Sequence, residues 1–342
     1  MLSGTLGNTM PTGEGANLKR LAWGAGVGLV YGAALRFAYV LLPNTSHSYQ
    51  LMTIGFILFT PFAMGFITVF EVERLNSQPI WTWLLFPWVP VLGGLLASGV
   101  FLWEGLICIV MFTPIALVSA TVGGVAAGII GRFVRSRAFR NGTLVCVVSL
   151  PLLVSPLERQ SLSKKELRHV ESVIDIKASP ATVWRNIERV PPISNSELKP
   201  SWSHAIGFPN PVEATLSKEG VGGVRNATFE GGVLFIETVD IWEPDHRLGF
   251  SIRAQTDRIP KTTLDEHVTI GGEYFDVLHG DYEIESLSNG LTRLHLRSLH
   301  RVSTDLNWYA HLWTDAVMRD LQVRILHVIR DRSEHLDAAS VS

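Results

Sequence analysis

Four long apolar runs in the first half of the chain constrain its fold more than any other sequence feature. They lie at roughly 21–42, 51–70, 80–103 and 105–131. Each has about twenty residues or more, the length that an α-helix needs to cross a hydrocarbon core of about 30 Å. The sequence offers no amphipathic neighbours that would cover such helices in water. We therefore expect an all-α transmembrane bundle that makes the chain an integral, multi-pass membrane protein.

The residue types at the edges and on the faces of these runs agree with membrane spans. Tryptophans occur near the expected ends, where amphipathic rings prefer the membrane interface: Trp23, Trp81, Trp83, Trp88 and Trp103. Glycines at intervals of four allow close helix packing: Gly24, Gly28 and Gly32 in the first run, Gly124 and Gly128 in the fourth. Only Arg36 is ionisable within a run, so anchoring is a better hypothesis than transport.

A fifth apolar run, at 143–157, leaves the topology open. It has about fifteen residues and contains Pro151 and Pro156, which is at or below the lower limit for a span. The Lys and Arg residues of the flanking loops favour an N-terminus on the inside. We expect this run to span, which puts the C-terminal half on the outer or periplasmic face. If it lies in the interface instead, that half is cytoplasmic.

Composition excludes several classes of function. The chain is 47% hydrophobic and 18% charged, which is too apolar for an ordinary soluble protein. No basic patch with interleaved aromatic residues occurs, so nucleic acid is not an expected partner. The two cysteines, Cys108 and Cys146, rule out a disulfide framework and are too few for a soft-ligand metal site. No nucleotide-binding glycine motif occurs, and we expect neither a metal nor a cofactor.

The C-terminal half has the pattern of an α+β domain. A long amphipathic helix is predicted from Thr304 to about Arg332, with an apolar stripe: Trp308, Leu312, Ala316, Leu321, Ile325, Val328 and Ile329. Ser179 and Pro180 are typical of a helix start. Alternation of apolar and polar residues predicts strands: 170–177, 224–229, 233–242, 248–254, 267–270, 274–285 with a turn near 279–280, and 292–300. The expected architecture is an antiparallel sheet wrapped around the last helix.

These segments divide the chain into expected parts. Residues 1–18 are a tail with little apolar content, and 19–157 form the membrane region. A polar linker occupies 158–169, the α+β domain occupies 170–333, and 334–342 form a second tail.

Several motifs of this half resemble a known family. They are Ile176-Lys-Ala-Ser-Pro-Ala-Thr-Val-Trp184, the turn Phe229-Glu-Gly-Gly232, Trp242-Glu-Pro244, and Ser303 with Asn307-Trp308-Tyr309. Together with the order of elements, they resemble the START-like (SRPBCC) superfamily, polyketide cyclase/dehydrase-like branch, over about 170–332. The resemblance implies a helix-grip fold with an apolar cavity between sheet and helix. In that superfamily the cavity binds lipids, sterols, polyketides or other hydrophobic molecules, and only some members are enzymes.

Glu237 is the most informative candidate in this cavity. It shares one face of its strand with Phe235. If that face points inward, its carboxyl group has a raised pKa and acts as a ligand anchor or general acid; the alternative is an exposed or salt-bridged side chain. For each candidate histidine, a structural role is the alternative. The full set of candidate ligand-binding residues is Phe235, Glu237, Phe250, His267, Tyr274, His300, Trp308, Leu312 and Asp315.

The sequence has no constellation typical of catalysis. It contains no nucleophile elbow, HExxH motif or phosphate-binding loop. We therefore expect a membrane-anchored protein that binds a hydrophobic small molecule or lipid. Two alternatives stay open: a cyclase, dehydratase or hydrolase that uses His267, Glu237 or Asp315, and a sensor that couples ligand binding to the membrane bundle through the linker.

Overall fold

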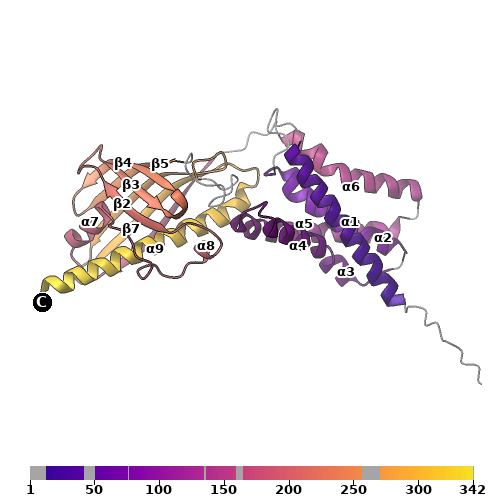
Figure 1. The fold of residues 1–342 in the computed structure, drawn as a ribbon, viewed down its shortest axis with the longest axis horizontal. Coiled ribbons are helices and arrows are strands. Elements are labelled where there is room, and N and C mark those ends of the chain that lie inside the picture. Colours follow the sequence, from indigo (N-terminus) through magenta and orange to yellow (C-terminus); the bar gives the residue numbers. More distant parts are fainter. Residues whose placement is uncertain are drawn as a thin grey trace, which may run out of the picture. The chain divides into compact units, whose positions relative to one another are not determined.

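The computed structural model describes residues 13–41, 51–75, 77–134, 136–158, 165–255 and 270–341 (Figure 1). The chain divides into two compact units, one made up mainly of the helices that precede Ser163 and the other mainly of the chain from Ser163 onward. All the regular secondary structure among the described residues of the N-terminal unit is helical. Its elements are α1 (Gly13–Leu41), a π-helical turn η1 (Gly55–Phe59), α2 (Thr60–Leu75), α3 (Ile80–Leu85), α4 (Trp88–Val100), α5 (Leu106–Phe133) and α6 (Arg137–Glu158).

Four stretches of the described helices are long and apolar enough to cross a membrane, judged by length and composition. They are Leu18–Leu41, Ile80–Val100, Leu106–Phe133 and Asn141–Glu158. The run expected at 51–70 forms a shorter apolar helix, Gly55–Phe70. The run at 143–157, expected to be the shortest, lies within the 22-residue α6. Polar residues from Arg137 onward supply the extra turns, and both prolines lie inside the helix.

Glycines let α1 approach α2 closely, as their spacing predicts. A Cβ at Gly24 would lie 2.7 Å from the carbonyl oxygen of Thr68, and one at Gly28 would lie 3.0 Å from that of Met64. One at Gly32 would lie 2.6 Å from the sulfur of Met64. Only glycine leaves room for these contacts, which give dispersion attraction between helices that no hydrophobic effect drives together in lipid.

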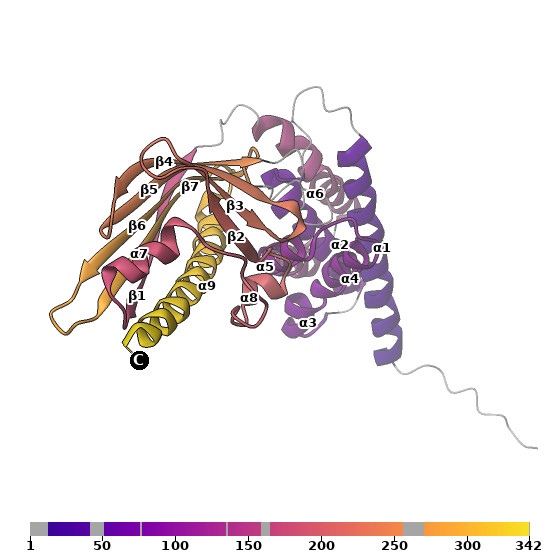
Figure 2. The same ribbon diagram turned by 60° about the vertical axis from the view of Figure 1, so that its left-hand side comes forward.

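The C-terminal unit is built on a seven-stranded antiparallel sheet of order β1-β7-β6-β5-β4-β3-β2. Its strands are β1 (Glu166–Ile176), β2 (Pro211–Leu216), β3 (Val224–Phe229), β4 (Leu234–Glu243), β5 (Arg247–Gln255), β6 (Phe275–Ser286) and β7 (Thr292–Val302). A 3₁₀ turn, η2 (Glu230–Gly232), joins β3 to β4. The helices are α7 (Pro180–Glu188), α8 (Trp202–Ala205) and α9 (Asn307–Val341). Figure 2 shows the sheet curving over α9, which is the expected helix-grip arrangement.

Local sequence signals explain several of these boundaries. Ser179 caps α7 by accepting a hydrogen bond from the backbone N–H of Thr182 at 3.2 Å, and Pro180 is its first helical residue. Gly290, at φ 78°, forms the expected turn between β6 and β7. Positive φ is accessible to glycine without steric strain, so the chain reverses there.

Other boundaries differ from the sequence expectations. No turn occurs near His279 and Gly280: β6 continues through a bulge between Val277 and His279. A bulge kinks a strand without ending it. The helix α1 begins at Gly13, inside the expected tail, and α9 continues to Val341, through the other tail. Strand β2 was not expected, and the 267–270 strand lies outside the described residues except for Ile270.

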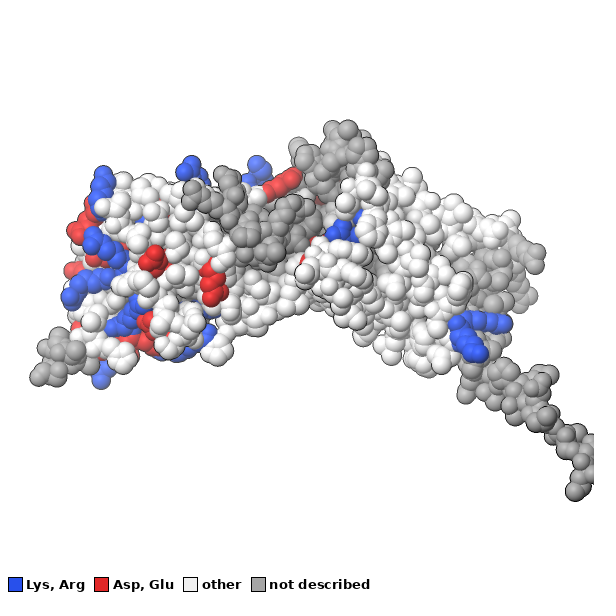
Figure 3. Space-filling view, in the orientation of Figure 1, with Lys and Arg blue, Asp and Glu red and all other residues white. Residues whose placement is uncertain are grey.

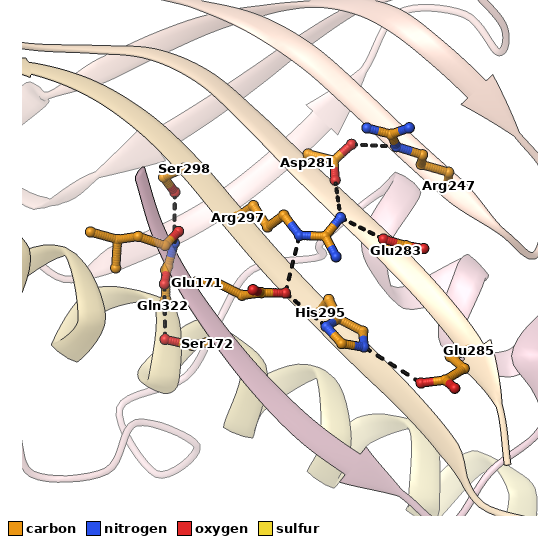
Figure 4. Close-up of polar contacts among 11 residues, drawn as sticks. Glu171, Ser172, Arg247, Asp281, Glu283, Glu285, His295, Arg297, Ser298 and Gln322 are labelled. Carbon is orange, nitrogen blue, oxygen red and sulfur yellow. Dashed lines mark hydrogen bonds and ion pairs between the residues drawn. The ribbon is translucent and has the colours of Figure 1, made fainter. Parts of the chain in front are cut away.

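Gln322 anchors α9 to the sheet. Its side-chain oxygen accepts a hydrogen bond from Ser172 of β1 at 2.8 Å. Its NH₂ group donates to Ser298 of β7 at 2.9 Å and to the carbonyl oxygen of Val170 at 3.1 Å (Figure 4). The side chain is fully buried, and all three partners are strand residues. These bonds fix how α9 is rotated on the sheet.

Ion pairs cover the opposite face of the same strands. Arg297 of β7 lies among carboxylates from its two neighbouring strands (Figure 4): Glu171 at 3.0 Å, Asp281 at 3.4 Å and Glu283. The Asp281 carboxylate is buried, whereas Arg297, Glu171 and Glu283 are half-exposed, and half-exposed ion pairs contribute little each. They show which face of the sheet is in water, because the residues that alternate with Arg297 on β7 are buried.

We expect Gln322→Ala to destabilise the C-terminal unit by about 2–4 kcal/mol, because buried polar groups left without a partner cost about 1–3 kcal/mol each. Val323→Ala, on the exposed side of the same turn, is the control, with an expected change within about 0.5 kcal/mol. Thermal and denaturant unfolding of the detergent-solubilised chain measures both. Equal stability of the two variants would contradict the anchoring role.

Candidate functional site

A cavity lies between the concave face of the sheet and α9. The volume open to the centre of a water-sized sphere is about 100 Å³, several times the ~10–15 Å³ that one water molecule needs. Its wall is mainly apolar, with side chains from β3, β4, β5 and α9. Examples are Ala227, Phe229, Phe235, Phe250, Met318 and Leu321. A largely apolar cavity with a few polar groups is the usual form of a small-molecule site.

A buried ion pair forms the main polar feature of this wall. Arg225 of β3 and Glu237 of β4 are paired across the two strands, and the guanidinium donates a hydrogen bond to the carboxylate. Their side chains are only 5% and 6% exposed. The guanidinium carbon also lies 5.3 Å from the ring centre of Phe250, within the range of a cation–π contact.

Tyr282 of β6 adds its hydroxyl to the polar part of the cavity wall, where it interacts electrostatically with Arg225. Burial raises the pKa of the Tyr282 hydroxyl to about 12, so the phenol stays protonated at any physiological pH. Burial also raises the pKa of the Glu237 carboxyl, and the guanidinium of Arg225 opposes this rise. The Nε–H of Arg225 is buried and has no hydrogen-bond partner among the described residues. The cavity therefore contains a charged, partly unsatisfied donor.

The predicted site residues do not all lie in the cavity: some line its wall, some form a second polar cluster and some are exposed on α9. Phe235, Glu237 and Phe250 line the cavity. The inward face of β4 is thus the one that carries Glu237, and this side chain is both buried and salt-bridged, combining the two readings that the sequence left open. His267 lies outside the described residues. Tyr274 is half-buried just before β6 and is not part of the cavity wall.

His300 and Asp315 meet in a second polar cluster, away from the cavity wall. The Nε2 atom of His300 on β7 lies 3.4 Å from Asp315 on α9. Arg168 of β1 donates to the same carboxylate at 2.5 Å. His300 is fully buried, and burial lowers its pKa to about 4, against the attraction of Asp315. The imidazole is therefore neutral at pH 7, and the cluster joins three elements of the fold.

Trp308 and Leu312 were expected in the pocket, but their side chains are 65% and 64% exposed. The reason is helical geometry. From Leu312 to Leu321 the helix turns about two and a half times, so the two leucines point to opposite sides. The apolar stripe read from the sequence combines two faces, and only the later one, with Leu321 and Ile325, lines the cavity.

Sequence reasoning missed Arg225 and Tyr282. A signal for Arg225 existed, because it shares a strand face with Ala227 and Phe229, where a charge is unusual. The turn at Gly231 and Gly232 also sets the register of the β3–β4 hairpin. Counting outward from that turn places Arg225 opposite Glu237. No comparable local signal points to Tyr282, which comes from a strand not adjacent to either.

Among the residues that the structure describes, no group of three or more His, Cys, Asp or Glu side chains is placed to hold a metal ion. The polar side chains of the cavity wall are those of an arginine, two glutamates, a tyrosine, a threonine, a serine and a glutamine. These are suited to hydrogen-bonding an organic ligand.

No protein-family model and no curated protein matches this chain. Solved structures that match it are START-like and polyketide cyclase-like proteins, and the likeness is confined to the C-terminal half. The ZhuI aromatase/cyclase from Streptomyces sp. R1128 is 15% identical, with a TM-score of 0.30, over 51% of this chain and 98% of its own. A START superfamily protein from Mycobacterium smegmatis is 11% identical, with a TM-score of 0.32, over 49% and 98%.

Norcoclaurine synthase from Thalictrum flavum is 11% identical, with a TM-score of 0.31, over 49% of this chain and 94% of its own. At these identities and TM-scores the likeness says nothing of what this chain binds or does.

We expect Arg225→Met alone to lower the free energy of unfolding by about 3–5 kcal/mol, because Glu237 is left buried without its partner. The double variant Arg225→Met/Glu237→Leu should be about as stable as the wild type or more so, since apolar residues replace both charges. Denaturant unfolding measures this cycle. A double variant no more stable than the single one would show that the two charges do not compensate each other.

The stability of the C-terminal unit should fall as the pH drops from about 6.5 to about 4. The pKa of His300 is about 4 in the folded chain and about 6.5 in an unfolded one. Between these values the unfolded state binds the proton more readily, which favours unfolding. His300→Phe should remove this part of the pH dependence, whereas His246→Phe, at an exposed position, should not. Melting temperatures across this pH range measure the difference, and parallel pH profiles for wild type and His300→Phe would contradict it.

Proposed function

We propose that this chain is a membrane-anchored protein whose C-terminal unit binds a hydrophobic small molecule or lipid between the sheet and α9. The observation that carries the proposal is the cavity, whose wall is apolar except for a few buried polar groups. Removal of apolar ligand surface from water would supply the affinity, at about 25 cal/mol per Å², reduced by the free-energy costs of association.

The polar groups indicate an amphiphilic ligand. Arg225 and Tyr282 both line the cavity, and the Nε–H of Arg225 is buried without a hydrogen-bond partner among the described residues. A ligand oxygen, from a hydroxyl, carbonyl or carboxylate group, satisfies such donors. A buried polar group without a partner is unfavourable, so a ligand that supplies an acceptor here gains specificity over a pure hydrocarbon.

The N-terminal unit supports the anchoring part of the proposal. Many of its large apolar side chains are exposed, among them Trp23, Leu96, Val118 and Phe133. Figure 3 shows few charged side chains on the visible face of this unit, whereas acidic and basic side chains alternate over the sheet-bearing unit. A surface with many exposed apolar side chains and few charges is stable in lipid rather than in water.

An enzyme acting in the same cavity is the second candidate, because Glu237 is a carboxyl group whose pKa is raised by burial, as in many general acids. Its ion pair with Arg225 opposes that role, since it holds the carboxylate in its charged form. Asp315, the other acid considered for catalysis, is paired with Arg168 and His300 instead. These pairings favour binding over catalysis as the first hypothesis.

The test is native mass spectrometry with organic extraction of the full chain, purified in detergent from its host. We expect a co-purified hydrophobic molecule that is at least about tenfold depleted in Ala214→Leu, which fills part of the cavity. Thr215→Leu, on the exposed side of the same strand, is the matched control and should keep the ligand. Equal occupancy in two folded variants would refute the cavity as the site, and a changed product after incubation with the extracted ligand would favour the enzyme.

A further inference from the structure

The first turns of α9 expose an aromatic surface that the cavity does not use. Trp308 and Leu312 are four residues apart, so they lie on one side of the helix, and both are mostly exposed. Tyr309 and Trp313 are half-buried next to them. The ring centres of Trp308 and Tyr309 are 5.8 Å apart, and those of Tyr309 and Trp313 are 6.5 Å apart. We call these four residues the aromatic surface.

The chemistry of this surface differs from that of the rest of the helix. The stretch 306–314 contains no Asp, Glu, Lys or Arg, whereas 315–337 contains nine such residues. Indole and phenol rings have an apolar body and a polar tip, and such side chains gather at the level of the lipid headgroups. The composition therefore fits the interface of a bilayer better than it fits bulk water.

The path of the chain places this surface beside the entry to the C-terminal unit. The helix α6 ends at Glu158 and β1 begins at Glu166, so at most about 29 Å of extended chain joins them. The carboxylate of Glu166 lies 2.8 Å from Nε2 of His311, which is in the same turns of α9 as Trp308 and Leu312. The segment that leads from the apolar helices thus ends next to the aromatic surface.

We propose that the aromatic surface of α9 docks into the headgroup region of the lipid bilayer that holds the N-terminal helices. The proposal rests on the membrane anchoring proposed above, because the end of α6 must lie at a bilayer for Glu166 to be within reach of it. It does not depend on ligand binding. The helix α9 also forms one wall of the cavity. Docking therefore places this wall next to the lipid bilayer, from which an apolar ligand would come.

The experiment uses the full chain with Cys108→Ala and Cys146→Ala, reconstituted in phosphatidylcholine and phosphatidylglycerol vesicles. A single cysteine is placed at Leu312 or, as the matched control, at Leu336, another exposed leucine of α9 about 36 Å along the helix. Each is labelled with an NBD fluorophore. Nitroxide groups on the lipid chains, close to the headgroups, then quench the dyes that lie in the interface.

We expect Leu312→Cys to show blue-shifted emission and at least threefold stronger quenching than Leu336→Cys. Adding Trp308→Ser should reduce the quenching at position 312, because the anchor is weakened while an exposed side chain leaves the fold intact. Equal quenching at the two positions would overturn the proposal. Blue-shifted emission without quenching would also overturn it, since a protein surface would then cover the helix.

Extraction with alkaline carbonate separates the two proposals. A chain that stays in the membrane pellet while positions 312 and 336 are quenched equally refutes docking and leaves the anchoring intact. A chain released into the supernatant refutes the anchoring, and docking with it.

Discussion

The burial of α9 against the concave face of the sheet is the constraint on which the C-terminal unit depends. A two-layer unit has one sheet to cover the apolar side of its long helix. Gln322 determines which side of the helix that is, because its amide group has partners on both β1 and β7. With this rotation Met318, Leu321 and Ile325 face the sheet. The space that they and the strand side chains leave unfilled is the cavity.

The ion pair of Arg225 and Glu237 is buried, and the burial of two charges is costly. Such a pair is weak evidence for stability, since apolar side chains of similar size often do as well. The pairs of Arg297 with Glu171 and Glu283, on the outer face of the sheet, do not carry that cost because these side chains are half in water. A charged pair inside an apolar cavity is better explained by a ligand that needs it. This is the physical basis for preferring an amphiphilic ligand to a hydrocarbon.

Both units present apolar side chains that water does not favour. In the N-terminal unit, exposed apolar side chains occur along the length of several helices, such as those that contain Trp23 and Leu96. In the C-terminal unit two of the most exposed, Trp308 and Leu312, lie together in the first turns of α9. The lipid bilayer that we propose as the partner would account for both surfaces: its hydrocarbon core for the helices and its headgroup region for the aromatic rings. The proposals for anchoring and for docking therefore rely on the same property of a lipid bilayer, which accommodates apolar and aromatic side chains that are unfavourable in water.

The sequence by itself determined most elements of this protein and their order. Run length predicts the apolar helices, alternation predicts most strands, and Ser179, Pro180 and Gly290 predict a helix start and a hairpin turn. These features depend on neighbours within a few residues, which is why they can be read locally. The same is true of the shared strand face of Phe235 and Glu237.

Only the tertiary structure decided which faces are covered. Periodicity relates residues within one element, but it does not say which other element lies on them. The inward face of β4, the exposed position of Trp308, the contact of His300 with Asp315 and the place of Tyr282 beside Arg225 all follow from packing between distant segments. The cavity has the same origin, because it is the space that remains when helix and sheet are fixed by contacts elsewhere.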